Sequence, residues 1–263
     1  MSTDHLPPQE PARMLELLWG TTEPPTRGPK PGLSVAKIVE TAVRIADEEG
    51  LAAVSMRRVA EELGFTTMSL YRYVSSKDDL LELMQDAAAV PSPDIDFDAV
   101  PDHWRDAAKW WASNNLVMFR RHPWFMDIPL SGPPMGPNQV RWMERFLRAL
   151  EPTGLSPGEK MGILTLISTY ALSAGRLEHS LTQAASKTGV EPDAWDPLYG
   201  EMLAKVIDPV EFPALTEVLQ SGIFSGPADS PPDEIAFGLE VILDGVEALI
   251  ARRRGESTAP SPP

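Results

Sequence analysis

The 263-residue sequence predicts an all-α fold, with a small N-terminal helical domain followed by a larger helical bundle. Apolar residues recur every three or four positions through most of the chain, which is the spacing of one face of an α-helix. No segment alternates apolar and polar residues in the way that a half-buried strand does. Ser, Gly and Pro residues stand at the ends of the periodic segments, where they begin and end helices.

Composition and motifs exclude several classes of function. The chain has no cysteine, so it cannot form disulfides, thiolate metal sites or a cysteine nucleophile. It contains no GxSxG, HExxH, P-loop or GxGxxG motif, so we expect neither an enzyme nor a bound cofactor or metal. The longest uncharged apolar run, residues 161–175, is too short to cross a bilayer, and the N-terminus lacks the order of a signal peptide. We therefore expect a cytoplasmic protein with no membrane partner.

Residues 1–33 are rich in proline and predict a flexible N-terminal extension. Arg27 and Lys30 lie just before the first expected helix, which runs from its cap Ser34 to Glu49. An extended basic arm at this position could enter the minor groove of DNA. An ordinary solvated linker has the same composition, and the sequence does not decide between the two.

Residues 55–77 predict two short helices joined by a tight turn. Ser55 can cap the first helix, whose apolar stripe consists of Met56, Val59, Ala60 and Leu63. Gly64 follows the stripe, at a position where a left-handed backbone costs glycine little. A second helix over residues 67–74 comes next, with two apolar residues turned inward. This arrangement is a helix-turn-helix, which places its second helix in the major groove of DNA.

The outward side of the second helix carries residue types that contact nucleic acid. A helical hairpin in an ordinary bundle would share the apolar pattern, but exposed tyrosines beside Arg72 have little use on an inert surface. Phosphate contacts fix the register of a protein on DNA and base contacts read the sequence, and these side chains serve both. The sequence thus predicts a DNA-binding domain over residues 34–80. The predicted DNA-binding residues are Arg27, Lys30, Ser55, Arg57, Thr66, Thr67, Met68, Ser69, Tyr71, Arg72, Tyr73 and Lys77.

Residues 32–84 resemble the N-terminal domain of the TetR family of bacterial one-component repressors. The resemblance rests on EEGLAAVSMRRVAEELGF and SLYRYVSSKDDLLELM, and its most specific part is a run formed by Leu70, Tyr71, Tyr73, Val74, Lys77 and Leu80. The resemblance implies that Tyr71, Tyr73 and Lys77 hold phosphates. It also implies that Thr67, Met68, Ser69 and Arg72 face the groove, and that Arg57 contacts the backbone or a base.

The distribution of charge favours a dimer. The chain carries a net charge of −15, but residues 27–77 hold eight basic and six acidic residues, a net charge of +2. Residues 91–263 hold fourteen basic and twenty-four acidic residues, a net charge of −10, so the acidity lies mainly away from the DNA-binding segment. Affinity for DNA grows with the number of phosphates neutralised. Two copies on one duplex would therefore bind far better than one.

The rest of the chain predicts a ligand-binding and dimerisation domain over residues 81–254. A helix over residues 76–89 would connect it to the DNA-binding domain, and residues 255–263 predict a disordered tail. Further helices are expected over residues 102–121, 138–150, 156–187, 193–207, 211–221 and 231–254.

Aromatic residues gather in the central helices and predict a pocket for a small molecule. Mostly apolar walls with a few amides suit a planar or hydrophobic ligand, although simple core packing explains the cluster equally well. The run from Asn114 to Arg121 and Trp104 also resemble, more loosely, the effector domain of tetracycline-type repressors. The predicted effector-binding residues are Trp104, Trp111, Asn115, Met118, Phe119, Trp142, Phe146 and Tyr170.

Two helices carry stripes that predict a homodimer interface. The TetR-family resemblance implies that two helices of each subunit pack into a four-helix bundle, whereas an internal pair of core helices would show the same pattern. The predicted interface residues are Leu164, Ile167, Ala171, Ala174, Ile235, Leu239, Ile242, Val246 and Leu249.

Together these features predict a ligand-responsive regulator of transcription. We expect a repressor that releases a palindromic DNA operator when a small hydrophobic or aromatic effector binds the C-terminal domain. The alternative is a dimeric DNA-binding protein that responds to no ligand and uses the C-terminal domain only to dimerise.

Overall fold

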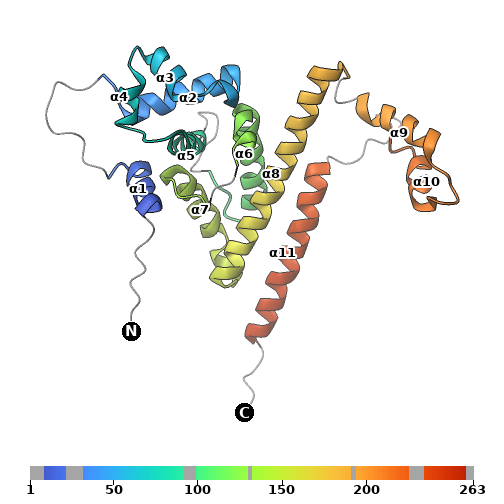
Figure 1. Cartoon of the computed structure of the whole chain (residues 1–263). Helices are drawn as coiled ribbons and strands as arrows, with labels where there is room; N and C mark the ends of the chain where they lie inside the picture. The colour runs from blue at the N-terminus through green and yellow to red at the C-terminus, as the bar shows by residue number, and fades with distance from the viewer. Residues whose placement is uncertain are drawn as a thin grey trace. The chain divides into compact units, whose positions relative to one another are not determined.

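The computed structural model describes residues 9–21, 32–91, 99–129, 132–190, 194–224 and 234–258. In these ranges the chain forms helices and turns and contains no strand (Figure 1), so the predicted all-α fold class is confirmed. The chain divides into two compact units, Met1–Leu172 and Ser173–Pro263. The helices of the first unit are α1 (Gln9–Leu18), α2 (Val35–Glu49), η1 (Leu51–Ala53), α3 (Met56–Leu63), α4 (Thr67–Tyr71), α5 (Lys77–Ala88), α6 (Trp104–Arg121), η2 (Pro123–Asp127), α7 (Pro137–Ala149) and η3 (Glu151–Thr153).

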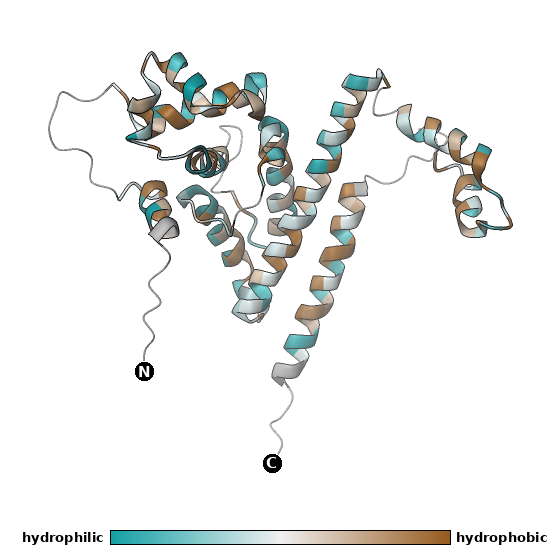
Figure 2. Cartoon of the chain, in the orientation of Figure 1, coloured by the Kyte–Doolittle hydropathy of each residue, from teal (hydrophilic) through white to brown (hydrophobic). Residues whose placement is uncertain are grey.

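The division between the units falls within a single long helix, α8 (Pro157–Thr188). The second unit also contains α9 (Trp195–Val206), α10 (Pro213–Gln220) and α11 (Glu234–Thr258). Figure 2 shows hydrophobic residues on α9 and α10, and Tyr199 packs edge-on against Phe224 with ring centroids 5.6 Å apart.

Two of the expected helix ends are wrong. The second helix of the helix-turn-helix ends at Tyr71, before the expected residue 74. Helix α11 continues to Thr258, so the predicted disordered tail is wrong for residues 255–258. The reason is that no proline interrupts α11 before Pro260, and a single Gly255 weakens a helix without ending it.

The prediction of a flexible N-terminal extension is wrong for residues 9–21, because α1 packs against other helices of the first unit. Arg13 donates through Nη2 to both carboxylate oxygens of Asp79, at 2.7 and 2.8 Å, and through Nη1 to the hydroxyl of Ser75 at 2.6 Å. Met14 is buried, and Trp19 donates from Nε1 to the carbonyl of Met135 at 2.9 Å. The amphipathic pattern of α1 therefore holds it on the start of α5 and on the turn before α7.

One core joins α2, α3, α4 and α5. Its fully buried members include Ile38, Val59, Leu70 and Leu80, and Trp124 from η2 packs into the same core. Helix α5 adds buried residues as far as Ala88, so the core continues beyond residue 80, where we expected the DNA-binding domain to end.

The Arg13 contact gives a testable prediction for stability. Arg13→Ala removes a bidentate ion pair to the nearly buried carboxylate of Asp79, so we expect the free energy of unfolding to fall by about 1 kcal/mol. The control is Glu48→Ala, which removes an exposed pair with Arg44 on α2 and should have a smaller effect. Urea titrations measure both changes. If the two variants lose the same free energy of unfolding, the Arg13 ion pair stabilises the fold no more than an exposed surface pair does.

Candidate DNA-binding face and ligand pocket

Local capping explains the shape of the helix-turn-helix. Ser55 accepts a hydrogen bond from the backbone N–H of Arg58 at 3.1 Å, which begins α3 as expected. Gly64 ends α3 with φ 73° and ψ 27°, a left-handed conformation that favours glycine. Thr66 then caps α4 by accepting from the N–H of Ser69 at 3.3 Å. Three caps within twelve residues therefore fix the turn between the two helices.

The short helix α4 is anchored from beneath and open on its outer side. Leu70 and Val74 are fully buried. Met68, by contrast, has 74% of its surface exposed and Tyr71 has 43%. Of the predicted DNA-binding residues, Arg57, Thr66, Met68, Tyr71, Arg72 and Lys77 are exposed, and Ser55, Thr67, Ser69 and Tyr73 are half-buried. Arg27 and Lys30 lie outside the described residues.

Two ion pairs hold α3 to α2. Arg44 on α2 pairs with Glu62 at 2.7 Å, and Arg58 on α3 pairs with Glu49 at 2.9 Å. Hydrogen bonds from Arg58 and then Arg44 lower the pKa of Glu62. Among the described residues, Arg57 pairs within its own helix, with Glu61 at 2.8 Å, on the surface.

The exposed outer side therefore keeps cations that can meet phosphate. Within the described ranges, Arg72 and Lys77 form no ion pair with an acidic side chain. We call Met68, Tyr71, Arg72 and Lys77, together with Thr67 and Ser69, the DNA-binding face.

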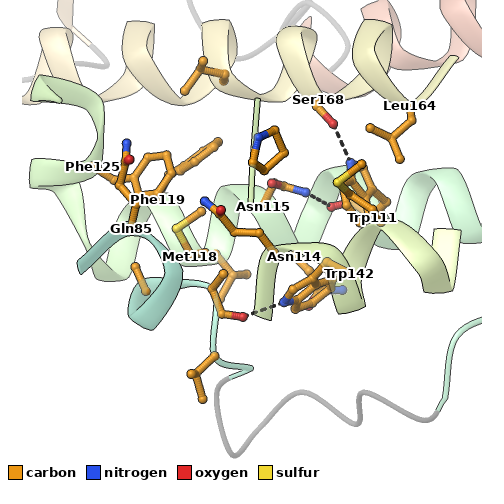
Figure 3. Close-up of a pocket in the computed structure, with 18 of the residues that line it drawn as sticks. Gln85, Trp111, Asn114, Asn115, Met118, Phe119, Phe125, Trp142, Leu164 and Ser168 are labelled. Atoms are coloured by element: carbon orange, nitrogen blue, oxygen red, sulfur yellow. Dashed lines mark hydrogen bonds between the residues drawn. The ribbon is translucent and has the colours of Figure 1, made fainter. Parts of the chain in front are cut away.

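A cavity of about 330 Å³ lies within the first unit, among α5, α6, α7 and α8 (Figure 3). Figure 3 shows aromatic and aliphatic side chains on its walls and amide side chains between them. The lining residues are Glu82, Gln85, Ala88, Ala89, Val90, Pro91, Trp111, Asn114, Asn115, Val117, Met118, Phe119, Arg121, Phe125, Gly132, Pro133, Pro134, Gln139, Trp142, Met143, Leu164, Thr165, Ser168, Thr169 and Leu172.

Two tryptophans of the cavity have their polar edges bound to the protein. Trp111 donates from Nε1 to the hydroxyl of Ser168 at 3.1 Å, and Trp142 donates from Nε1 to the carbonyl of Ala89 at 2.6 Å. Their rings meet edge to face within the wall, with ring centroids 6.0 Å apart and planes at 76°. These bonds fix the rings, so the cavity presents rigid aromatic surface to a ligand.

Asn114 and Asn115 are polar groups on the cavity wall that can orient a ligand. Each donates from Nδ2 to the carbonyl four residues earlier in α6, at 2.8 Å. An amide held in this way offers its carbonyl oxygen as an acceptor. The cavity can therefore receive a flat apolar molecule that carries hydroxyl or N–H donors.

The cavity brings together five of the eight predicted effector-binding residues. Trp111, Asn115, Met118, Phe119 and Trp142 line it. The remaining three, Trp104, Phe146 and Tyr170, do not line it. Phe146 is buried behind the wall, where its ring packs on Trp111 with centroids 5.4 Å apart, and Trp104 is buried at the start of α6.

The structure also adds lining residues that we had not predicted, from α5 and α8. Among them are Gln85 and Ala88 on α5, Ala89 just after it, and Thr165, Ser168 and Thr169 on α8. The pocket was predicted from aromatic residues, and small or polar side chains such as these cannot be recognised in that way. Only the fold brings them to the cavity.

Part of the predicted dimer interface is wrong. Ile167 and Ala171 are almost completely buried inside their own chain, and Leu164 lines the cavity. Side chains enclosed in this way cannot contact a second copy. Of the other predicted interface residues, Leu239 and Val246 are buried, and Ala174, Ile235, Ile242 and Leu249 are half-buried. Exposed apolar side chains on the same two helices include Met161, Leu166, Leu177, Leu181, Phe237 and Val241.

A polar contact ties α2 of the helix-turn-helix core to the end of α6. One carboxylate oxygen of Asp47 lies 2.7 Å from Nδ1 of His122 and accepts from Nε1 of Trp124 at 2.6 Å. Trp124 belongs to the same core as α2. The DNA-binding helices and the cavity wall are therefore joined by both apolar and polar contacts.

Neither a metal site nor a membrane span occurs among the described residues. No group of three or more His, Asp or Glu side chains there is arranged to hold a metal ion. No described helix is long and apolar enough to cross a bilayer.

An exposed second helix of a helix-turn-helix and a ligand-sized cavity in the same chain define a one-component transcription regulator. Residues 38–84 match the model of bacterial regulatory proteins of the tetR family, and residues 98–250 match the tetracyclin repressor-like C-terminal domain. The chain belongs to the tetR family and is a ligand-responsive, DNA-binding regulator of transcription. The predicted partners, an operator, a small-molecule effector and a second copy, are those of this family.

Known relatives agree in sequence and in fold. The HTH-type transcriptional repressor DrrR1 of Streptomyces coeruleorubidus is 42% identical over 94% of this chain and 89% of its own length. Apo ActR from Streptomyces coelicolor is 28% identical, with a TM-score of 0.67 over 85% of this chain and 99% of ActR. The structure of ActR in complex with actinorhodin is 30% identical, with a TM-score of 0.67 over 84% of this chain and 97% of that one.

Proposed function

We propose that this protein is a dimeric repressor that releases a palindromic operator when a flat, mainly aromatic effector enters the cavity. The observation that carries the proposal is the cavity, which lies within the unit that also holds the DNA-binding face. Residues 34–80 are the DNA-binding segment, and residues 81–254 bind the effector and the second copy. The protein would act in the cytoplasm, where the DNA is, and would catalyse no reaction.

The DNA-binding face supports insertion of α4 into the major groove. Exposed Met68 and Arg72 would meet base edges, while Tyr71 and Lys77 would meet phosphates. Arg57 and Thr66 are exposed at the edge of this face and would add backbone contacts, and the half-buried Ser55 and Tyr73 would support them. Two copies would place their α4 helices about one DNA turn, roughly 34–36 Å, apart.

The chemistry of the cavity supports an aromatic effector with polar substituents. Trp111, Phe119 and Trp142 provide flat apolar surface, and Asn114 and Asn115 provide acceptors. ActR, which this chain resembles along most of its length, has been crystallised with actinorhodin. A planar polycyclic molecule with hydroxyl groups is therefore the class of effector that we propose.

The exposed apolar residues of the second unit support a dimer. Leu177, Leu181, Phe237 and Val241 lie on α8 and α11 and would be covered by a second copy. Leaving these large side chains in water is unfavourable, and burying them in a symmetric interface removes that cost.

The direct test is selection of a duplex from a random-sequence pool by the whole protein, followed by titration with a panel of planar aromatic compounds that includes actinorhodin. We expect a palindromic duplex, and release by at least one compound. A palindrome that no compound releases would favour the ligand-independent alternative. Failure to enrich any sequence would contradict DNA binding.

Arg72 and Lys77 should differ in how they affect operator affinity. Arg72→Ala should cost about 1–3 kcal/mol on operators that carry the base pair it contacts, and should relax specificity there. Lys77→Ala should weaken binding to all sequences alike. It should also reduce the slope of log affinity against log salt concentration by about the amount expected for one lost phosphate contact. Binding to single-base variants at several salt concentrations measures both. Equal losses on every sequence for the arginine variant would reassign Arg72 to phosphate contact.

A further inference from the structure

The last turn of α5 and the first turn of α7 are joined by the carboxylate of Asp86. Its Oδ1 accepts from the backbone N–H groups of Asn138 and Gln139, at 3.0 and 3.1 Å. Its Oδ2 accepts from the side-chain amide of Asn138 at 2.9 Å, and this amide also donates to the Asp86 carbonyl at 3.2 Å. A side chain of α5 therefore caps α7 in the way that a residue of α7 itself would do.

The backbone before α7 is shaped for this contact. A Cβ atom placed on Gly136 would lie 2.0 Å from Oδ1 of Asp86, so only glycine permits the approach. The φ of Gly136 is −75°, which any residue can adopt, so close packing is the reason for the glycine. Burial raises the pKa of Asp86, and the hydrogen bonds from Gln139 and Asn138 partly oppose that shift.

The same joint forms part of the cavity wall. Gln85 and Ala88 line the cavity from α5 and Ala89 from its C-cap, and Gln139 and Trp142 line it from α7. Trp142 bridges the two helices again through its bond to the Ala89 carbonyl. A ligand between these walls would therefore contact both of the helices that Asp86 joins.

Helix α5 leads from this joint to the DNA-binding face. Lys77 begins α5, and the buried Leu80 and Met84 pack in the core that anchors Leu70 of α4. A shift of the last turn of α5 is thus carried along one rigid helix to the base of the DNA-binding face.

We propose that Asp86 is the residue that transmits occupancy of the cavity to the DNA-binding face, by tying α5 to the capped end of α7. The inference rests on the proposed function, since it needs an operator and a cavity that responds. Asp86 contacts neither DNA nor ligand in this account and acts as a positioning residue. Removing its carboxylate should therefore leave both binding events in place and weaken the coupling between them.

The test uses a tethered occupant, so that it does not depend on the identity of the effector. The chain has no cysteine, so Thr169→Cys introduces a single thiol at an exposed position of the cavity wall. Labelling it with pyrene maleimide places a planar aromatic group at the cavity. The same label on Ser113→Cys, an exposed position of α6 outside the cavity lining, is the control for the label itself.

The readout is the ratio of operator affinities, before and after labelling, for the duplex selected by the wild-type protein. We expect the label on residue 169 to lower affinity about tenfold or more in the parent, and less than about threefold when Asp86→Ala is added. Gly136→Ala, which displaces the carboxylate without removing it, should act like Asp86→Ala. Asp86→Asn should keep most of the response, because its remaining oxygen can accept from both backbone N–H groups.

A cap elsewhere controls for loss of stability. Ser156 caps α8 by accepting from the N–H of Glu159 at 3.3 Å, away from the joint, so Ser156→Ala should destabilise the fold and leave the label response unchanged. A full response in Asp86→Ala, with the parent responding, would overturn the role of Asp86 and leave the proposed function standing. No response to the label on residue 169 in the parent would instead count against the responsive cavity, and the inference would fall with it.

Discussion

Leu70→Ala is expected to lower the free energy of unfolding by about 2–5 kcal/mol and to abolish operator binding at concentrations where the wild-type protein is saturated. Leu70 is fully buried and is the one buried residue of α4. A five-residue helix has too few internal hydrogen bonds to persist alone. The position of the DNA-binding face therefore depends on this side chain and on Val74 behind it.

Met68→Ala is the matched control for Leu70→Ala, because it truncates an exposed side chain on the same helix. Its effect on stability should be within about 0.5 kcal/mol of zero, so that any change in its operator affinity reports lost groove contacts. Thermal unfolding and operator titration of both variants separate anchoring from contact. If the Leu70→Ala protein has the same melting temperature as the wild type, contacts other than that of Leu70 anchor α4.

The helix-turn-helix could be predicted from sequence because its determinants are local. Ser55, Gly64 and Thr66 act within three residues of the helix ends that they cap, so each signal and its effect lie in the same short segment. The end of α4 was harder to predict. Its apolar spacing continues to Val74, but the backbone turns after Tyr71, and Val74 reaches the core from the turn that follows.

The cavity could be predicted only in part, because packing between distant segments shapes it. Aromatic content marks α6 and α7, but it does not distinguish Trp111, which faces the cavity, from Phe146 behind it. Asp86 carries no sequence signal at all: its partners lie 52 and 53 positions further along the chain. Helix α1 was missed for a different reason, since the prolines around it suggested an extended chain and its binding site on Asp79 is equally remote.

Asn115→Trp is expected to produce a repressor that binds its operator and no longer releases it. Asn115 lies on the cavity wall between Trp111 and Met118, as Figure 3 shows, and an indole there would fill space that a ligand needs. The DNA-binding face is made by other residues, and an indole on α6 fills only part of the space that a tethered pyrene would occupy between α5 and α7. Operator affinity without ligand should therefore change by less than about threefold. Release by any compound that dissociates the wild-type complex should weaken by about tenfold or more.

Ser113→Trp provides the matched control for Asn115→Trp, because it adds the same side chain to an exposed position of α6 outside the cavity lining. The Ser113→Trp variant should release the operator at the same ligand concentration as the wild-type protein does. Operator titrations with increasing ligand, together with direct binding of the same ligand, compare the two variants. If Asn115→Trp binds and responds to the ligand as the wild type does, the effector acts elsewhere. If it binds the ligand but keeps the operator, the cavity accepts the ligand and the added ring blocks transmission, since a ligand shifts the equilibrium only when it favours the released state.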